Sequence, residues 1–451
     1  MDPRRRAWLA LALAAFAAAG CGGGRHTTSS PPAPRVGPPT RITGPAWPTY
    51  HANLARTAAV ASGPSPASVR LVWSTPVDGA VYAEPVVAAG RVVVATENDS
   101  LYAFDTSGRM RWHVKLGSPV AGGDLPCGDI DPSGITGTPA IDAGVVYAVT
   151  LEPPAHHMLV AVDLATGAVR WRRAVDPPGA DASVEQQRAA LAVANGRVYV
   201  AYGGLFGDCG NYNGWVVGVS AAHPAAALSA YRVPSAREAG IWAPSGPAVD
   251  ARGSLYVSTG NGVSSSFDFG NAVIRLSPTL ARQDFFAPPN AAQLNGTDGD
   301  LGSTGPLLLP GDRVAVVGKN GIGYIASTTH LGGVGGQLQS RSLCGGEGAF
   351  GGLAYANGDV YVPCTNGLVA LRASDLGPLW SGPSFTAGAP IVAGAAVWVV
   401  DTDSGTLYAL DARTGTVRFH ARIGDTAHFA TPAAAGGRIY VAAGHHLLAF
   451  G

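Results

Sequence analysis

A pattern of two β-strands joined by a glycine turn recurs eight times along this chain. Three copies illustrate it: PVVAAGRVVV from Pro85, PAIDAGVVYAV from Pro139 and LAYANGDVYV from Leu353. A third strand and then a fourth, usually aromatic, strand follow, so each unit holds four strands in about 40–50 residues. The eight turn glycines are Gly90, Gly144, Gly196, Gly253, Gly311, Gly358, Gly394 and Gly437. This period predicts an all-β fold, an eight-bladed β-propeller of four-stranded antiparallel blades.

The two ends of the repeat array complement each other. The eighth copy stops after its third strand, HLLAF, at Phe450, and an extra aromatic strand, LVWST from Leu71, precedes the first copy. We expect this N-terminal strand to join the last blade and close the ring. Closure also accounts for a single domain over residues 46–451, because each blade of a repeat array buries its faces against its neighbours.

Composition narrows the classes of function. Charged residues make up 13% of the chain, about half the usual share, and the formal net charge is zero. A protein that binds nucleic acid needs a basic surface, so we expect no nucleic-acid partner. Helical periodicity is nearly absent, and residues 181–188 are the segment for which we expect one or two helical turns.

The start of the chain resembles an export signal. Arginines at residues 4–6 precede an apolar stretch, residues 7–19, which is too short to span a bilayer as a mature helix. Cys21 follows Ala-Ala-Gly, as in the bacterial lipoprotein box, where the cysteine receives a lipid. We expect a signal peptide with lipobox at residues 1–21, then a disordered Gly/Ser/Pro tether at residues 22–45. The protein would be exported and anchored to a membrane of the bacterial cell envelope; the alternative is a plain secretory signal.

Four further cysteines suit disulfides in the oxidising space outside the cytoplasm, where an even number can pair fully. Three pairings are possible. Cys344 and Cys364 flank the first two strands of the sixth repeat, and Cys127 and Cys209 lie in loops of neighbouring blades. We expect the disulfides Cys344–Cys364 and Cys127–Cys209.

The turns between third and fourth strands carry a more specific motif. They read AVDLATGAVRW from Ala161 and ALDARTGTVRF from Ala409, with a looser AFDTSGRMRW from Ala103. This string resembles the tryptophan-docking motif of the pyrroloquinoline quinone (PQQ) repeat family, in which the Trp of one blade lies against the Ala and Gly of its neighbour. Burying such a ring stabilises the junction by about 2–3 kcal/mol. The resemblance implies a PQQ-like propeller.

The resemblance also implies where a functional site would lie. In this family, quinoprotein alcohol dehydrogenases bind PQQ and calcium on the propeller axis, whereas scaffold lipoproteins such as the outer-membrane assembly factor bind protein segments. In repeat three, Asp208 is the carboxylate that stands nearest to the sequence position at which the family has its calcium-binding Glu. In repeat four, Trp242 matches the floor under the quinone and Asn261 matches a calcium ligand. Each also has a plain structural role open to it, as a turn residue or a lining hydrophobe.

Repeat five supplies the residues that the resemblance connects with catalysis. In the segment GTDGDLG from Gly296, Asp298 matches the family's catalytic base and Asp300 its second Asp. Lys319, one of two lysines in the chain, matches a cation that contacts the quinone oxygens. A cation beside a quinone carbonyl would polarise it toward hydride acceptance.

Other positions depart from the quinoprotein pattern. In quinoproteins a disulfide between two adjacent cysteines caps the quinone, and this disulfide cannot form here because Cys127 is followed by Gly128. The family's Glu ligand to calcium is also replaced. The sequence therefore supports two functions. The first is a cell-envelope lipoprotein whose propeller binds a small molecule or a protein at its axial face. The alternative is a calcium- and PQQ-dependent alcohol dehydrogenase of the polyvinyl-alcohol type, with Asp298 taking the hydroxyl proton.

Overall fold

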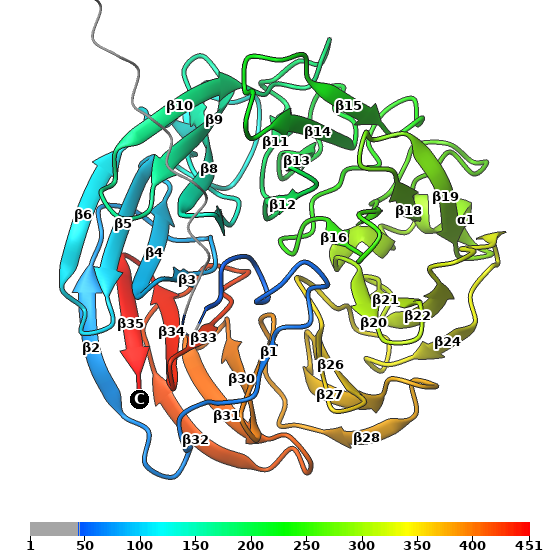
Figure 1. Cartoon of the computed structure of the whole chain (residues 1–451). Helices are drawn as coiled ribbons and strands as arrows, with labels where there is room; N and C mark the ends of the chain where they lie inside the picture. The colour runs from blue at the N-terminus through cyan, green and yellow to red at the C-terminus, as the bar shows by residue number, and fades with distance from the viewer. Residues whose placement is uncertain (1–43, 45) are drawn as a thin grey trace, which may run out of the picture. The chain divides into compact units, whose positions relative to one another are not determined.

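Eight β-sheets stand around a common axis and form a ring (Figure 1). The computed structural model describes Gly44 and residues 46–451, within the unit that spans residues 39–451. Every sheet contains four antiparallel strands, so the predicted eight-bladed propeller is confirmed. The signal peptide, the lipid anchor on Cys21 and nearly all of the tether at residues 22–45 lie outside the described residues and stay predictions.

The first strand of each blade lies nearest the axis and the fourth at the rim (Figure 1). Blade one contains β3 (Val86–Ala88), β4 (Arg91–Thr96), β5 (Ser100–Asp105) and β6 (Met110–Lys115). Blade two contains β7 (Ala140–Asp142), β8 (Val145–Glu152), β9 (His156–Asp163) and β10 (Val169–Ala174). Blade three contains β12 (Ala192–Ala194), β13 (Arg197–Gly204), β14 (Trp215–Ser220) and β15 (Ser229–Arg232). Blade four contains β16 (Ala248–Val249), β17 (Leu255–Ser258), β18 (Val273–Leu276) and β19 (Arg282–Ala287).

The second half of the ring repeats this order. Blade five contains β20 (Leu307–Leu309), β21 (Arg313–Val317), β22 (Ile322–Ser327) and β24 (Gln339–Ser342). Blade six contains β25 (Ala354–Ala356), β26 (Asp359–Cys364), β27 (Gly367–Arg372) and β28 (Pro378–Ser381). Blade seven contains β29 (Ile391–Ala393), β30 (Ala396–Asp401), β31 (Thr406–Asp411) and β32 (Val417–Arg422). Blade eight contains β33 (Ala433–Ala435), β34 (Arg438–Ala443), β35 (His446–Phe450) and, from the other end of the chain, β2 (Leu71–Pro76).

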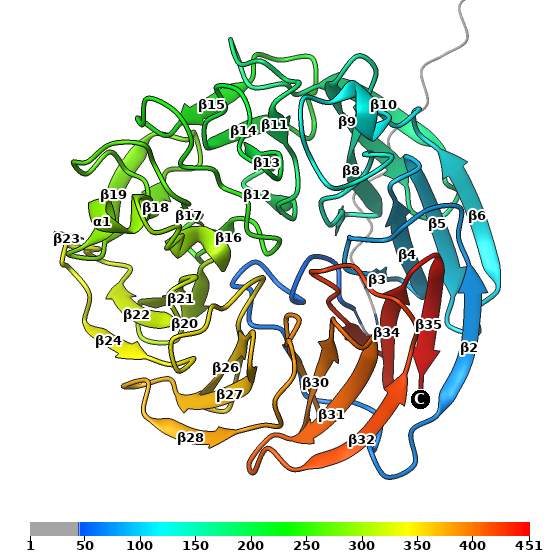
Figure 2. The ribbon, with the colours of Figure 1, turned by 180° about the vertical axis from the view of Figure 1, so that it is seen from behind.

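Blade eight closes the ring as the sequence predicts. Strand β2 pairs antiparallel with β35, with Trp73 opposite Ala449 and Pro76 opposite His446. Figure 2 shows β2 and the C-terminal strand side by side from behind. The outer strand of the last blade therefore comes from the beginning of the propeller, which removes two free sheet edges at once.

A few short elements lie outside the repeat. The strands are β1 (Ala59–Val60), β11 (Glu185–Gln186) and β23 (Gly333–Val334), and the helices are α1 (Ala291–Asn295), η1 (Gly122–Asp124) and η2 (Leu301–Ser303). The prediction of helical turns at residues 181–188 is wrong, because that segment contains β11. The end of strand β13 extends beyond its pairing with β12, and this extension pairs antiparallel with β11, with Gly204 opposite Glu185.

Tryptophan docking joins neighbouring blades at the rim. A Cβ on Gly167 would lie 2.9 Å from the Trp112 ring, so only glycine lets the indole lie flat on that turn. The indole Nε1 also donates to the carbonyl of Leu164 at 2.9 Å, which satisfies its polar atom. The same two contacts occur where Trp73 lies on Gly108 and where Trp380 lies on Gly415.

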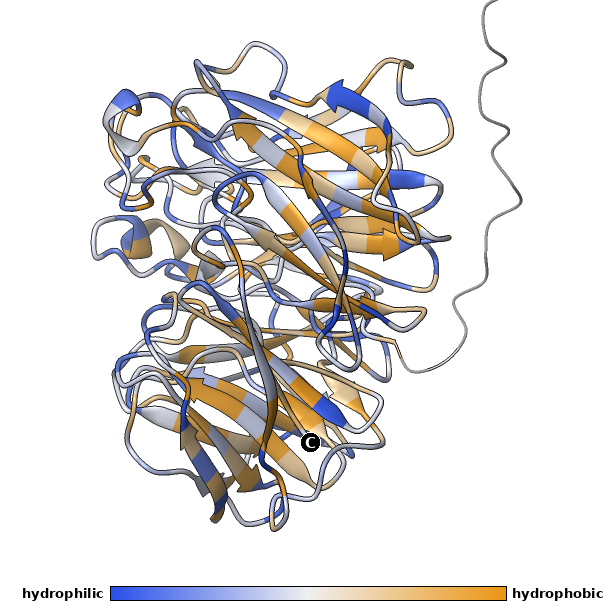
Figure 3. Cartoon of the chain, turned by 90° about the vertical axis from the view of Figure 1, so that its left-hand side faces the viewer, coloured by the Kyte–Doolittle hydropathy of each residue, from blue (hydrophilic) through white to orange (hydrophobic). Residues whose placement is uncertain are grey.

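The hydrophobic core is divided into layers between neighbouring blades. One cluster packs Val93 and Ala103 of blade one against Val146 and Val160 of blade two, and similar clusters follow around the ring. Figure 3 shows the apolar residues concentrated along the strands. Both faces of a blade meet another blade, so inner strands such as β4 are apolar at nearly every position.

An N-terminal segment, residues 47–60, runs along the inner edges of the blades. Its backbone bonds β3 at Val87 of blade one, then Ile141 of blade two, and later Val249, Leu308, Tyr355 and Val392 of blades four to seven. This segment, which we call the inner strap, crosses the centre of the ring (Figures 1 and 2). It satisfies backbone groups on edge strands that would otherwise have no partner.

Arg56 fixes the inner strap from within. Its side chain is 1% exposed, and its guanidinium donates to the carbonyls of Pro247 at 2.8 Å and Tyr50 at 2.9 Å. Glu84 is equally buried and accepts from the His51 backbone at 2.8 Å and the Trp47 indole at 3.0 Å. The strap is therefore held by buried polar groups as well as by backbone pairing.

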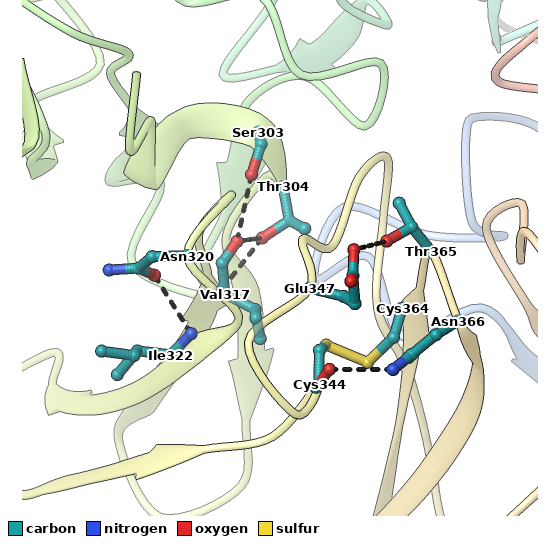
Figure 4. Close-up of a disulfide and its surroundings, with 10 residues drawn as sticks. All are labelled: Ser303, Thr304, Val317, Asn320, Ile322, Cys344, Glu347, Cys364, Thr365 and Asn366. Atoms are coloured by element: carbon teal, nitrogen blue, oxygen red, sulfur yellow. Dashed lines mark hydrogen bonds between the residues drawn. A yellow bond between two sulfur atoms is a disulfide. The ribbon is translucent and has the colours of Figure 1, made fainter. Parts of the chain in front are cut away.

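The disulfide Cys344–Cys364 is confirmed (Figure 4). It links the loop after β24 to the end of β26, and the Asn366 side chain donates to the carbonyl of Cys344 at 3.0 Å. The bond therefore fastens a loop between blades five and six to blade six itself.

Alternating strand directions decide which loops can form a site. In each blade, the loop between the second and third strands and the connection to the next blade lie at the same end of the ring, because antiparallel strands reverse direction at each step. The glycine turns and the tryptophan-docking turns lie at the opposite end. The six residues that the sequence nominates for chemistry all stand in the first group of loops, so they lie at one end of the ring.

Candidate functional site

A cavity of about 750 Å³ opens at the loop end of the axis. Its walls come from connections and loops of blades all around the ring. All six residues that the sequence nominates for chemistry line it: Asp208, Trp242, Asn261, Asp298, Asp300 and Lys319. The structure thus brings them together in one place, while the roles that the resemblance implies for them stay predictions.

Lys319 lies between two carboxylates. Its Nζ is 2.8 Å from Asp298 Oδ1 and 2.5 Å from Asp300 Oδ2. Lys319 follows β21, whereas both Asp residues lie in the connection from blade four to blade five, so the ion pairs join two separate loops. The Asp298 side chain is 74% exposed and that of Asp300 only 9%, which leaves Asp298 as the carboxylate that a ligand can reach.

Burial and charge act against each other in this cluster. Burial raises the pKa of Asp300, although Lys319 and the backbone N–H of Asn261 counter that effect. For Lys319, burial alone would lower the pKa, but the charges of Asp300 and Asp298 and their hydrogen bonds outweigh it, so its pKa is raised. The ammonium therefore stays charged at neutral pH.

Asn261 is held by its neighbours rather than free for a ligand. Its Nδ2 donates to Asp298 Oδ1 at 3.0 Å, and its Oδ1 accepts from the Asn271 side chain at 3.1 Å. The Asn261 backbone N–H donates to Asp300 Oδ1 at 2.5 Å. Asn295 continues the network, accepting from Asn271 at 2.8 Å. The amide oxygen that the resemblance assigns to calcium is thus already hydrogen-bonded.

A second acidic group lies on the blade-three side of the cavity. Asp208 accepts from the Tyr212 hydroxyl at 2.6 Å, and Glu238 also lines the cavity. Burial raises the pKa of Glu238, and the charges of Asp208 and Asp300 add to this effect. Sequence reasoning missed Glu238. Its position four residues before Trp242, in the same connection between blades, was the available signal.

Aromatic rings form one wall of the cavity. The Trp242 ring lies 6.4 Å from the ring of Phe350 and 6.4 Å from that of Phe429, tilted in each case. Lys319 Nζ lies 5.5 Å from the Trp242 ring centroid. We call Trp242, Phe350 and Phe429 the aromatic wall. Phe350 and Phe429 were not predicted, because they stand in irregular connections without a recognisable motif.

The disulfide Cys127–Cys209 is confirmed and lies beside the cavity. Asp129 and Ile130 follow one cysteine and Phe206 precedes the other, and all three line the cavity. The disulfide therefore links two loops at the mouth of the cavity, one between blades one and two and one within blade three.

The arrangement of these residues does not match the calcium-binding part of a quinoprotein site. Within the described part of the chain, no three His, Cys, Asp or Glu side chains are grouped closely enough to hold a metal ion. The Asn261 oxygen is occupied by Asn271, and Lys319 already balances Asp298 and Asp300. We therefore derive no chemistry that needs calcium.

The quinone half fits better. A flat ring system needs an aromatic surface and nearby cations for its carbonyl oxygens, and the cavity offers Trp242 with Lys319 above it. Asp298 remains exposed beside the same lysine. The cavity volume also lies within the roughly 300–1,000 Å³ range of small-molecule sites.

Propeller, motif and cavity together define a PQQ-like propeller protein. A family profile described as "Outer membrane protein assembly factor BamB" matches residues 65–322 and 323–450. The chain belongs to this family. No curated protein matches the chain in sequence.

Solved structures from two functional classes share the fold. Quinohemoprotein alcohol dehydrogenase from Comamonas testosteroni superposes with a TM-score of 0.73 at 17% identity, over 90% of this chain and 80% of that one. A europium-containing methanol dehydrogenase gives 0.69 at 15% identity, over 89% and 90%. BamB from Moraxella catarrhalis gives 0.59 at 16% identity, over 85% and 98%. At such identities the likeness establishes the fold, and function must be argued from the site.

Proposed function

We propose that this protein is an exported, membrane-anchored propeller that binds a small, flat ligand in its axial cavity. The convergence of Trp242, Asp298 and Lys319 on one cavity carries the proposal. These three side chains come from three different loops, and such grouping of an aromatic surface with charged groups is typical of small-molecule sites.

The cellular location in this proposal rests on other observations. Two disulfides suit a compartment outside the cytoplasm, and Cys21 follows a segment that resembles an export signal. No helix in the described part of the chain is both long and apolar enough to cross a membrane. A lipid on Cys21 would supply the anchor, and the family description names the outer membrane.

Calorimetric titration with flat probes tests the binding proposal. We expect at least one of PQQ, menadione and 2-naphthoate to bind saturably, and Trp242→Ala to weaken that binding at least about tenfold through lost ring contact. Trp171→Ala is the control, because Trp171 lies on an outer strand away from the cavity. The proposal fails if no probe binds at millimolar concentration, or if Trp242→Ala binds as well as wild type.

The second candidate is a PQQ-dependent alcohol dehydrogenase, favoured by the pairing of Asp298 with Lys319. PQQ, when bound, supplies the hydride acceptor. Asp298 would accept the hydroxyl proton of the alcohol, since Oδ1 bonds Lys319 and Asn261, whereas no hydrogen bond within the described residues engages Oδ2. Lys319 is kept charged by Asp298 and Asp300, and its ammonium group would stabilise negative charge that develops on a group bound beside it.

Dye-linked oxidation of primary alcohols tests this candidate. With PQQ present, we expect turnover that falls about 100-fold or more in Asp298→Asn, the usual loss when a general base is removed. Asp312→Asn, an exposed surface residue, should keep full activity. Full activity in Asp298→Asn would exclude the assigned base, and absence of dye reduction despite PQQ binding would leave the binding function alone.

A further inference from the structure

The cavity contains a second cation, Arg188, that neither the repeats nor the resemblance singles out. Arg188 follows β11 in the connection from blade two to blade three, and its side chain lines the cavity. Within residues 46–451 it makes one hydrogen bond to a side chain, from Nη2 to Gln186 Oε1 at 2.7 Å. Among the residues that the structure describes, no carboxylate forms an ion pair with it.

Arg188 and Lys319 are placed alike but paired differently. Lys319 Nζ lies 5.5 Å from the Trp242 ring centroid, and the Arg188 guanidinium carbon lies 5.5 Å from that of Phe429. Both rings belong to the aromatic wall. Lys319 is balanced by two carboxylates, whereas Arg188 is not. The wall therefore has one neutralised cation and one whose charge is left without a partner.

The other groups around Arg188 do not balance its charge. Burial lowers the pKa of the guanidinium, although Asp129, Tyr82, Glu97 and Asp208 counter this. Asp129 lines the cavity, but it is exposed to solvent and makes no ion pair with Arg188. Burial and the Arg188 charge lower the pKa of His428, so its imidazole is neutral at pH 7. A guanidinium stays protonated at this pH, so the charge remains.

We propose that Arg188 binds a carboxylate of the ligand, which makes the ligand of this cavity a flat organic acid. The carboxylate would take the guanidinium edge left open by Gln186, and the ring would lie on the aromatic wall. Guanidinium and carboxylate match in a planar, two-bond geometry, and the contact gains strength where water is excluded. This inference rests on the proposed binding function and narrows its ligand class.

Matched probes separate the carboxylate from the ring. We would titrate 2-naphthoate and its neutral amide, 2-naphthamide, into wild type, Arg188→Gln and Arg252→Gln by calorimetry. Arg252 is the control, because it pairs with Asp312 at 3.2 Å on the exposed surface and neither residue lines the cavity. We expect wild type and Arg252→Gln to prefer the acid by about tenfold or more, and Arg188→Gln to lose that preference.

The outcomes distinguish this inference from the function on which it rests. Equal binding of acid and amide by wild type would overturn the carboxylate site while leaving a flat-ligand site in place. An unchanged acid preference in Arg188→Gln would also overturn it, and so would failure of 2-naphthoate to bind at all. A circular dichroism spectrum and melting curve matching wild type would confirm that Arg188→Gln is folded. Arg188→Lys should keep part of the preference, since it retains charge but not the two-bond geometry.

Discussion

Single residues in this propeller show how burial governs charge. Asp99 is fully buried in the turn between β4 and β5, and neither of its carboxylate oxygens has a hydrogen-bond partner among the described residues. Burial, followed by the charges of Glu152 and Glu97, raises the pKa of Asp99 to about 8. Burial likewise raises the pKa of Glu97 to about 7 and that of Glu185 to about 8.

These raised pKa values predict a stability that falls as pH rises. The folded state binds the Asp99 proton more tightly than the unfolded state does. Asp99 therefore adds to the free energy of unfolding below about pH 4, and this contribution is lost as pH rises through about 8. Urea unfolding should show a higher free energy at pH 5 than at pH 8. In Asp99→Asn that difference should shrink by on the order of 2–4 kcal/mol.

Asp105→Asn is the matched control for the pH series. Asp105 lies in an exposed turn, where hydrogen bonds from Ser107 lower its pKa, so its contribution has the opposite sign and is lost on acidification. Its replacement should not reduce the loss of stability between pH 5 and pH 8. A wild-type protein that gains stability from pH 5 to pH 8 would contradict the assignment of buried carboxylates.

At the scale of single elements, the docked tryptophans connect the blades. Trp112→Ala should lower the free energy of unfolding by about 3–5 kcal/mol, because it removes a buried ring and its hydrogen bond to Leu164 together. Trp171 also lies on the fourth strand of its blade but is only partly buried and makes no such bond to any described residue. Trp171→Ala should therefore cost clearly less, and equal losses in urea unfolding would show that docking adds nothing.

The elements also show what sequence could and could not predict. The blades and the ring closure follow from repeat spacing, because the strand pattern recurs at a regular interval. The positions of the cysteines relative to the blades predict the disulfides, whereas the tryptophan contacts and the six cavity residues follow from the resemblance to the PQQ repeat family. Glu238 and Arg188 were missed because the connections that hold them have no periodic pattern. Arg188 follows β11, a two-residue strand that pairs with the extended end of β13 and carries no repeat pattern of its own.

At the scale of the whole molecule, the inner strap joins the ring across its centre. Arg56→Gln should destabilise the protein by about 3–5 kcal/mol, because it removes the buried donor that satisfies carbonyls of separate blades, those of Leu191 and Pro247. Arg252→Gln, which removes an exposed pair with Asp312, should change the unfolding free energy by less than about 1 kcal/mol. If both variants unfold at the same urea concentration as wild type, the strap is not a stabilising element.

The axial ligand site, the central claim of this account, can be tested by lysine acetylation because the chain has two lysines. Lys319 lies in the cavity, and Lys115 is exposed at the end of β6, away from it. Acetylation with an N-hydroxysuccinimide ester, read by mass spectrometry, should slow at Lys319 when a bound flat probe saturates the protein. The rate at Lys115 should stay the same. Equal rates at Lys319 with and without the bound probe would contradict the axial site.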